Sequence, residues 1–155
     1  MTDYSIEELL PHRSPMIFIS AVDSVDLDGG HLVARFEVKE SDIAYQHELN
    51  GIPTYASLEY MAQAIGCFVG IYDRTHHPDK EPGVGFVLGT RKLSVKNPVF
   101  HVGQTYFVDI KLLFFEESIA SFECIIYNAD KQEISQAIVN AYRPDNIETF
   151  RKEYT

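Results

Sequence analysis

The fold depends on one long apolar helix, predicted over Thr54–Tyr72 with the sequence TYASLEYMAQAIGCFVGIY. Apolar residues lie on nearly every side of this helix: Tyr55, Leu58, Met61, Ile65, Phe68 and Val69. A helix that is apolar all round is usually buried. Pro53 closes the preceding segment, and the hydroxyl of Thr54 can cap the helix by accepting a free first-turn N–H. The sequence therefore predicts a domain built around this helix.

Strands are predicted on both sides of the helix. Residues 16–26 and 31–39 are rich in apolar and β-branched residues and flank the turn signal Asp28-Gly29-Gly30, which predicts a hairpin. Four more strand-like segments follow the helix: VGFVLGTRKLSV, QTYFVDIKLLFFEE, IASFECIIYNAD and EISQAIVNAYRP. The turn signals between them predict an antiparallel meander. A short acidic helix ending at Pro11 precedes all of these. The fold class is therefore α+β, with an antiparallel sheet wrapped around one buried helix.

Length and composition favour a single globular domain. The 155 residues form one domain, 1–155, with a polar C-terminal tail over 144–155. A formal net charge of −10 argues against nucleic acid as the partner. The first residues have no basic, then apolar, signal pattern, and no apolar run reaches membrane-spanning length, so the expected location is the cytoplasm. Cys67 and Cys124 lie in apolar runs and are expected to be buried, reduced thiols.

Three motifs in the same order resemble one known family. The block IEELLPHRSPMIFI resembles the N-terminal signature of the 3-hydroxyacyl-acyl-carrier-protein dehydratases, and LEYMAQAIG is similar to their helix motif. GTRKLSVKNPVFHVGQTYFVDI is similar to the strand pair that follows. Within this group, PTYASLEYMAQ, GFVLGTRK and NAYRPD most resemble the dehydratase-like proteins of aryl polyene and related lipid clusters. The resemblance covers nearly the whole chain.

The resemblance implies a hotdog fold and a homodimer. In this family two sheets join edge to edge, and each active site lies at the subunit interface with the acyl chain beside the helix. The implied reaction is elimination of water from a 3-hydroxyacyl thioester held on an acyl carrier protein. This chemistry requires a base, an acid and hydrogen-bond donors to the thioester oxygen, so no metal or other cofactor is expected.

Glu59 matches the family's catalytic acid in the LEYMAQ motif, six residues after Pro53. Its apolar neighbours Leu58, Tyr60 and Met61 are expected to disfavour the ionised carboxylate, which suits proton donation. The alternative is a carboxylate that pairs with an arginine or lysine across the dimer.

Four further residues are expected along the substrate: Pro53, Thr54, Tyr55 and Gln63. Gln63 lies four residues after Glu59, so the same helix face can bring its amide to the carboxylate. A purely structural role, in which Gln63 ties the helix to a loop, is an equal alternative. Thr54 replaces a family glycine, and its Cβ narrows the approach of the thioester oxygen to the backbone.

His47 is the candidate base, although its position departs from the family pattern. The family histidine precedes the matching proline by eight residues, which without a gap is the position of Tyr45. His47 takes that role only if the loop before Pro53 is two residues shorter than usual. The alternative is a surface histidine.

The remaining charged residues are expected to serve other purposes. His12 is expected to support the fold, and His101 to lie in a turn. The pair His76-His77 beside Asp79 is expected to face solvent rather than a metal. A docking patch for an acidic carrier protein is predicted from four basic residues: Arg13, Arg91, Lys92 and Lys96. A solvated strand edge is the alternative.

These observations predict a 3-hydroxyacyl-carrier-protein dehydratase of fatty-acid-like or aryl polyene lipid synthesis, with His47 as base and Glu59 as acid. Two other functions remain open. A hotdog acyl thioesterase would use Glu59 to activate water instead. A non-catalytic acyl-binding subunit, or pseudo-dehydratase, would explain the altered histidine loop.

Overall fold

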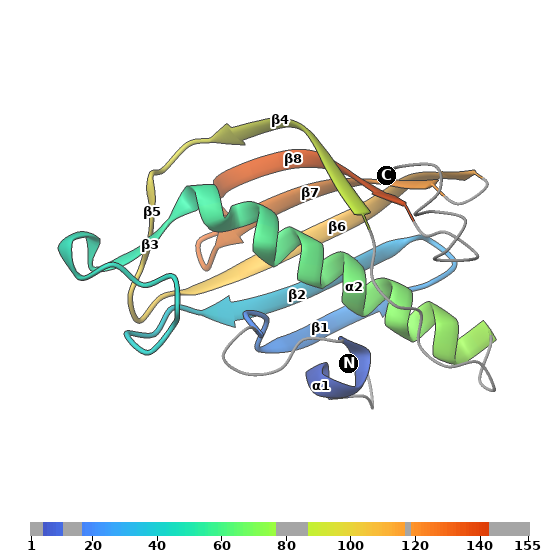
Figure 1. Cartoon of the computed structure of the whole chain (residues 1–155), viewed down its shortest axis with the longest axis horizontal. Helices are drawn as coiled ribbons and strands as arrows, with labels where there is room; N and C mark the ends of the chain where they lie inside the picture. The colour runs from blue at the N-terminus through green and yellow to red at the C-terminus, as the bar shows by residue number, and fades with distance from the viewer. Residues whose placement is uncertain (1–4, 11–16, 77–86, 117–118, 143–155) are drawn as a thin grey trace.

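The computed structural model describes residues 5–10, 17–76, 87–116 and 119–142, and its ribbon is an antiparallel sheet curved around one long helix (Figure 1). The helical elements are α1 (Ile6–Leu9), the 3-10 turns η1 (His47–Leu49) and η2 (Thr54–Ala56), and α2 (Ser57–His76). The strands are β1 (Ala21–Asp26), β2 (His31–Glu37), β3 (Gly51–Pro53), β4 (Val87–Val95), β5 (Val99–His101), β6 (Thr105–Glu116), β7 (Ile119–Asn128) and β8 (Glu133–Tyr142).

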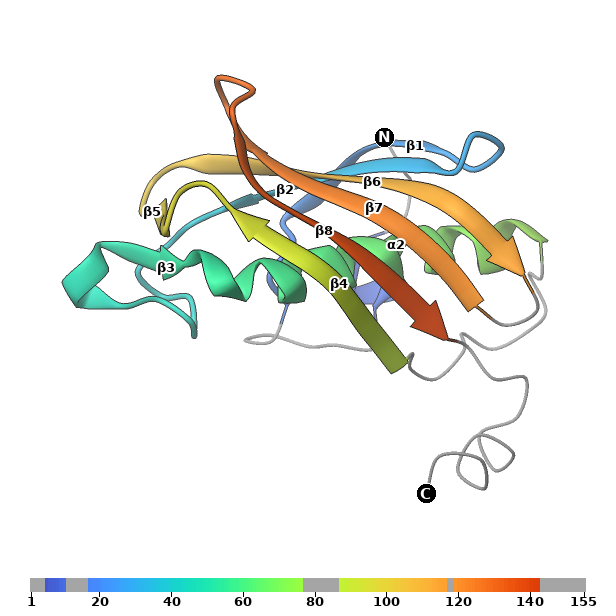
Figure 2. The same cartoon turned by 90° about the horizontal axis from the view of Figure 1, so that it is seen from above.

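The main sheet of the described residues has the strand order β1-β2-β6-β7-β8-β4, and every neighbouring pair is antiparallel. Figure 2 shows α2 crossing one face of this sheet. Side chains at alternate strand positions fill the space between them, as the period of a half-buried strand requires. The core side chains with no exposed surface include Leu32, Ala34, Phe36, Ile52, Met61, Ala64, Ile65, Val108, Ile110 and Ile126.

The predicted hairpin and N-terminal helix are confirmed. β1 and β2 pair across a turn in which the Asp26 carboxylate accepts the N–H of Gly29 at 3.0 Å. Gly30 follows with φ +67°, and a Cβ there would lie 2.8 Å from Cβ of Leu112, so glycine is required on both grounds. α1 begins at a capping box formed by Ser5 and Glu8.

The predicted meander is correct for β6, β7 and β8 but wrong for the first strand after the helix. β4 pairs with β8 at the sheet edge, so it does not lie beside β6. In the segment that connects β4 to β6, β5 leaves the main sheet and pairs with β3 in a two-stranded ribbon. The reason is that β2 already occupies the free edge of β6, which leaves the far edge of β8 for β4.

The predicted helix exists, but its ends and its surroundings differ from the prediction. It starts with the 3-10 turn η2, preceded by Pro53 with no side-chain cap, and α2 continues four residues beyond Tyr72 to His76. One side of the helix is incompletely covered in the single chain: Tyr55 is 69% exposed, Glu59 is exposed, and Ala62 and Val69 are half-buried. The helix is therefore buried against the sheet and open on the opposite side. No helix in the described part of the chain is long and apolar enough to cross a membrane.

Candidate active site

The candidate site lies at the start of α2, where two short strands hold the chain. Pro53 ends β3 and pairs with Val99 of β5. The N–H of Thr54 donates to the carbonyl of Pro98 at 3.0 Å, and Thr54 itself is buried. Because α2 begins three residues later, the β3–β5 ribbon fixes where the first turn of the helix starts. The predicted substrate residues Pro53 and Thr54 are therefore buried supports of that turn.

Glu59 is in the first turn of α2, and its side chain is exposed. The following residues, Tyr60 and Met61, turn into the core. The expected apolar enclosure of the carboxylate is therefore wrong for the single chain, since successive helix residues point about 100° apart and Glu59 faces outward. A carboxylate is electrostatically favourable at this position, because the positive end of the helix dipole lies at the first turn.

Gln63 is 1% exposed and holds the N-terminal segment against the helix. Its Oε1 accepts two backbone N–H groups, from Phe18 at 2.8 Å and from Ile19 at 3.3 Å. A buried amide oxygen that accepts two N–H groups satisfies donors which would otherwise be desolvated without a partner. This geometry matches the structural alternative for Gln63, a tie between helix and loop.

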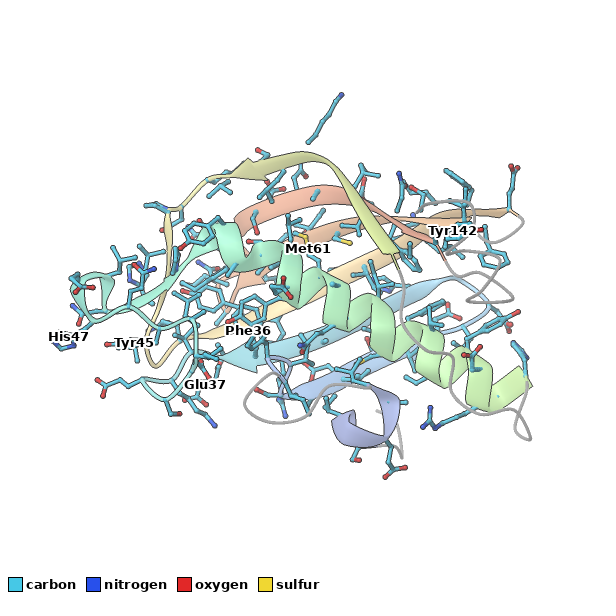
Figure 3. The ribbon with its side chains drawn as sticks, in the orientation of Figure 1. Phe36, Glu37, Tyr45, His47, Met61 and Tyr142 are labelled. Carbon is cyan, nitrogen blue, oxygen red and sulfur yellow. The ribbon has the colours of Figure 1, made fainter. Side chains whose placement is uncertain are left out.

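His47 opens the turn η1, and its side chain is exposed. The loop around it is tight, since Gln46 and Gly51 form an isolated bridge and Asn50 adopts φ +51° between them. Figure 3 places His47 at the outer end of this loop, well away from Met61 on α2, whereas Tyr45 lies nearer the body of the molecule. In the single chain His47 is thus an exposed residue away from Met61 of α2.

Several apolar side chains in the segments around His47 and the start of α2 are exposed. Tyr55 accepts a hydrogen bond at its Oη from Gln46 Nε2 at 3.3 Å, yet most of its ring is in solvent. Ile43, Leu49 and Val95 are also exposed, and the first two flank His47 in sequence. Gathered apolar side chains on a surface usually mark a face that another molecule covers. The sequence analysis singled out only Tyr55 of this group, as a residue expected along the substrate.

An aromatic cluster packs behind the start of α2. The rings of Phe36 and Tyr60 stack with centroids 3.7 Å apart, and Phe100 contacts both edge-on. Burial, with a smaller contribution from the charge of Asp42, raises the pKa of Tyr60 well above its usual value. Its phenol is therefore neutral at physiological pH. The cluster makes a rigid support beneath the residue next to Glu59, and strand periodicity alone did not reveal it.

The basic residues expected to dock a carrier protein are only partly described. Lys92 is exposed on β4 and has φ +54° at a bulge where the register with β8 shifts. Lys96 lies 3.2 Å from the Glu133 carboxylate, which neutralises part of its charge. Arg13 and the side chain of Arg91 lie outside the described residues. Of the two lysines of this patch whose side chains are described, Lys92 is exposed, and Lys96 is paired with a carboxylate.

Two other described histidines from the sequence analysis lie on β5 and at the end of α2. His101 ends β5, opposite Gly51, and its side chain is exposed. His76 packs edge-on against Tyr72 at the end of α2. His12, His77 and Asp79 lie outside the described residues. Across the described ranges, no three histidine, cysteine or acidic side chains gather in a way that could hold a metal ion.

The two cysteines are buried in the core, on α2 and β7, and have no exposed surface. Burial raises the pKa of the Cys67 and Cys124 thiols to about 12 in each case. A thiol with a raised pKa stays protonated at neutral pH and is a poor nucleophile.

We therefore expect neither thiol to react with a disulfide reagent such as DTNB at pH 8 in the folded protein. Both should react after unfolding in guanidinium. Rapid labelling of the native protein, at the rate of a free thiol, would contradict this burial.

A curved antiparallel sheet packed on one long helix defines a protein of the hotdog fold. A family model described as ApeP dehydratase matches residues 4–152, which is nearly the whole chain. The protein therefore belongs to the ApeP-like dehydratase family.

The chain is also similar to other known proteins in sequence or in fold. The chain is 30% identical over 97 residues to the 3-hydroxyacyl-[acyl-carrier-protein] dehydratase FabZ of Chlamydia trachomatis, over 61% of each chain. It thus aligns with about three fifths of the length of that curated relative. The fold matches a chain of the dehydratase heterocomplex ApeI:P from Xenorhabdus doucetiae, with TM-score 0.86 and 22% identity over 99% of this chain and 100% of that one. A hypothetical thioesterase from Streptococcus pneumoniae, solved with coenzyme A, matches with TM-score 0.56 and 12% identity over 79% and 84% of the chains.

Proposed function

We propose that this protein dehydrates 3-hydroxyacyl thioesters carried on acyl carrier protein, in fatty-acid-like or aryl polyene lipid synthesis. The observation that carries the proposal is Glu59, an exposed carboxylate in the first turn of a helix packed on the sheet, in the LEYMAQ motif that resembles the acid-bearing motif of the dehydratases. An exposed acid at a helix start can meet a substrate, and the neighbouring residue Tyr60 anchors this part of the helix by stacking on Phe36.

The reaction needs two proton transfers. A base removes a proton from C2, which the thioester carbonyl acidifies, and the electrons move toward the carbonyl oxygen. The electrons then form the C2–C3 double bond as the C3–O bond breaks, and an acid protonates the departing hydroxyl to give water. We assign the base to His47 and the acid to Glu59. The free N–H groups at the start of the helix are suited to hold the thioester oxygen.

A second subunit is proposed to complete the site. Figure 3 places His47 at the outer end of its loop, away from Met61 on α2, and its side chain is exposed. The exposed apolar side chains Ile43, Leu49 and Tyr55 lie near His47 or just before Glu59 in sequence and provide apolar surface for a partner to cover. We propose that two copies form a homodimer in which His47 of each faces Glu59 of the other. That arrangement would also supply the apolar surroundings that Glu59 lacks alone.

Carrier delivery is supported by charge and by family. The FabZ relative is named for substrates bound to acyl carrier protein. On this chain of net charge −10, Lys92 is an exposed cation on the edge strand β4. We propose that it contacts the acidic carrier, together with Arg13, Arg91 and Lys96.

Replacing His47 by alanine should lower the dehydration rate about 100-fold, because removal of a general base has an effect of this order. His47 is exposed, so the fold should be unaffected. The measurement is enoyl product formed from a 3-hydroxyacyl carrier protein, with His101→Ala as the matched exposed-histidine control. Equal rates for His47→Ala and the unsubstituted protein would remove His47 from the mechanism.

A non-catalytic acyl-binding subunit is the second candidate, favoured by the position of His47 away from Met61 of α2 in the single chain. In that case the protein alone would bind acyl thioesters and give no enoyl product, and activity would require a different, catalytic partner chain. The fold match to a thioesterase leaves hydrolysis as a third outcome. Release of free thiol from an acyl thioester without a 3-hydroxyl group would identify it.

A further inference from the structure

Two buried serines connect the first turn of α2 to the sheet. Ser57 is the first residue of α2 and Ser135 lies on β8, and both are 0% exposed. Their hydroxyl oxygens are 2.8 Å apart. Ser57 Oγ also donates to the carbonyl of Thr54 at 2.6 Å. A chain of hydrogen bonds thus runs from the core of the sheet to the backbone of η2.

Which hydroxyl donates in each of these hydrogen bonds follows from the number of hydrogen atoms available. A hydroxyl has one hydrogen to donate, and the hydrogen of Ser57 points to the Thr54 carbonyl. Ser135 must therefore donate to Ser57. Each hydroxyl has a defined role, and the Thr54 carbonyl receives a second bond in addition to the one from the Ser57 N–H.

Hydroxyls at these positions need an explanation beyond packing. A buried hydroxyl is costly unless it is hydrogen-bonded, and two apolar side chains of similar shape could fill the same space without that requirement. What the serines add is a fixed orientation of one peptide group. The peptide between Thr54 and Tyr55 is held through its carbonyl by Ser57, and the N–H of Thr54 is held by Pro98 at 3.0 Å.

This orientation bears on the thioester. In a trans peptide the carbonyl and the following N–H point in opposite directions, so fixing the Thr54 carbonyl also fixes the N–H of Tyr55. That N–H belongs to the first turn, where the helix offers no acceptor. It points out of the helix start, in the turn η2 that directly precedes the first turn of α2 with Glu59.

We propose that Ser57 and Ser135 are positioning residues that aim the Tyr55 N–H at the carbonyl oxygen of the bound thioester. The inference rests on the proposed function. Neither serine touches the substrate: they act through the Thr54–Tyr55 peptide, and a loosened peptide would stabilise the developing negative charge on the oxygen less well.

The test compares Ser57→Ala, Ser135→Ala and the double variant with Ser121→Ala, which removes another buried serine, on β7, outside the hydrogen-bond chain. We expect Ser57→Ala and the double variant to lower kcat/KM about 10-fold, with a lower kcat and a higher KM, because the thioester oxygen accepts the Tyr55 N–H both before and during the reaction. Ser135→Ala should have a smaller effect of the same kind. Ser121→Ala should leave kcat unchanged. The double variant leaves no unpaired hydroxyl, so it guards against a general loss of folding.

Binding separates this inference from the proposed function. The variants should bind an acyl-pantetheine thioester more weakly than the unsubstituted protein, yet bind the matching thioether, which lacks the carbonyl, equally well. Unchanged thioester binding and kcat in a folded double variant would overturn the positioning role. If the unsubstituted protein binds the thioester selectively but forms no enoyl product, dehydration fails, while the same binding comparison still decides the role of the serines.

Discussion

Glu59→Gln should lower the rate of enoyl formation by about 1000-fold, within the range for loss of a general acid. The amide keeps the shape of the side chain but cannot give up a proton to the departing hydroxyl. Because Glu59 is exposed at the helix start, the change should leave the melting temperature within a few degrees of that of the unsubstituted protein. The measurement is the steady-state rate on a 3-hydroxyacyl carrier protein.

The matched control is Glu37→Gln, an exposed carboxylate at the end of β2. It should retain the full rate, since it tests only loss of one negative charge from the surface. A Glu59→Gln protein that keeps more than about a tenth of the activity would show that the proton comes from elsewhere.

The largest stability effect is expected from Gln63→Leu. Leucine fills a similar volume but offers no acceptor, so the N–H groups of Phe18 and Ile19 lose their partner in the interior. Each unsatisfied buried donor costs about 1–3 kcal/mol, so we expect the free energy of unfolding to fall by about 2–4 kcal/mol. Denaturant unfolding at equilibrium measures this directly.

Gln136→Leu provides the comparison, because Gln136 is an exposed glutamine on β8. Its effect should stay within about 0.5 kcal/mol, as for most surface substitutions. Similar small effects for both variants would mean that the N-terminal segment is not held by Gln63.

The sequence predicted which helices and strands exist better than it predicted which strands pair with one another. Periodicity identified α2, the β1–β2 hairpin and the buried face of β6, because those signals are local. It missed that β4 pairs with β8, since the choice of partner depends on which sheet edges other strands have filled. It also missed the 3-10 start of the helix, which is stabilised by hydrogen bonds from Ser57 that no local pattern marks.

The candidate site was also predicted only in part. The motif and the helix spacing placed Glu59 and Gln63 on the long helix, but they predicted a helix that is buried on all sides. Small and apolar residues such as Ala62 and Val69 on the side of Glu59 gave that impression, although this side is only half-buried in one chain. His47 could not be placed, because the path of its loop depends on the αL turn at Asn50 and the bridge between Gln46 and Gly51.

The central claim is that two copies of this chain share each dehydratase site, and a mixing experiment tests it most directly. His47→Ala and Glu59→Gln proteins, each nearly inactive alone, are unfolded, mixed in equal amounts and refolded together. Random pairing makes half of the dimers mixed, each with one intact and one doubly substituted site, so the mixture should regain about one quarter of the unsubstituted activity. A mixture no more active than its components, under conditions where the unsubstituted protein forms enoyl product after the same treatment, would contradict the shared site.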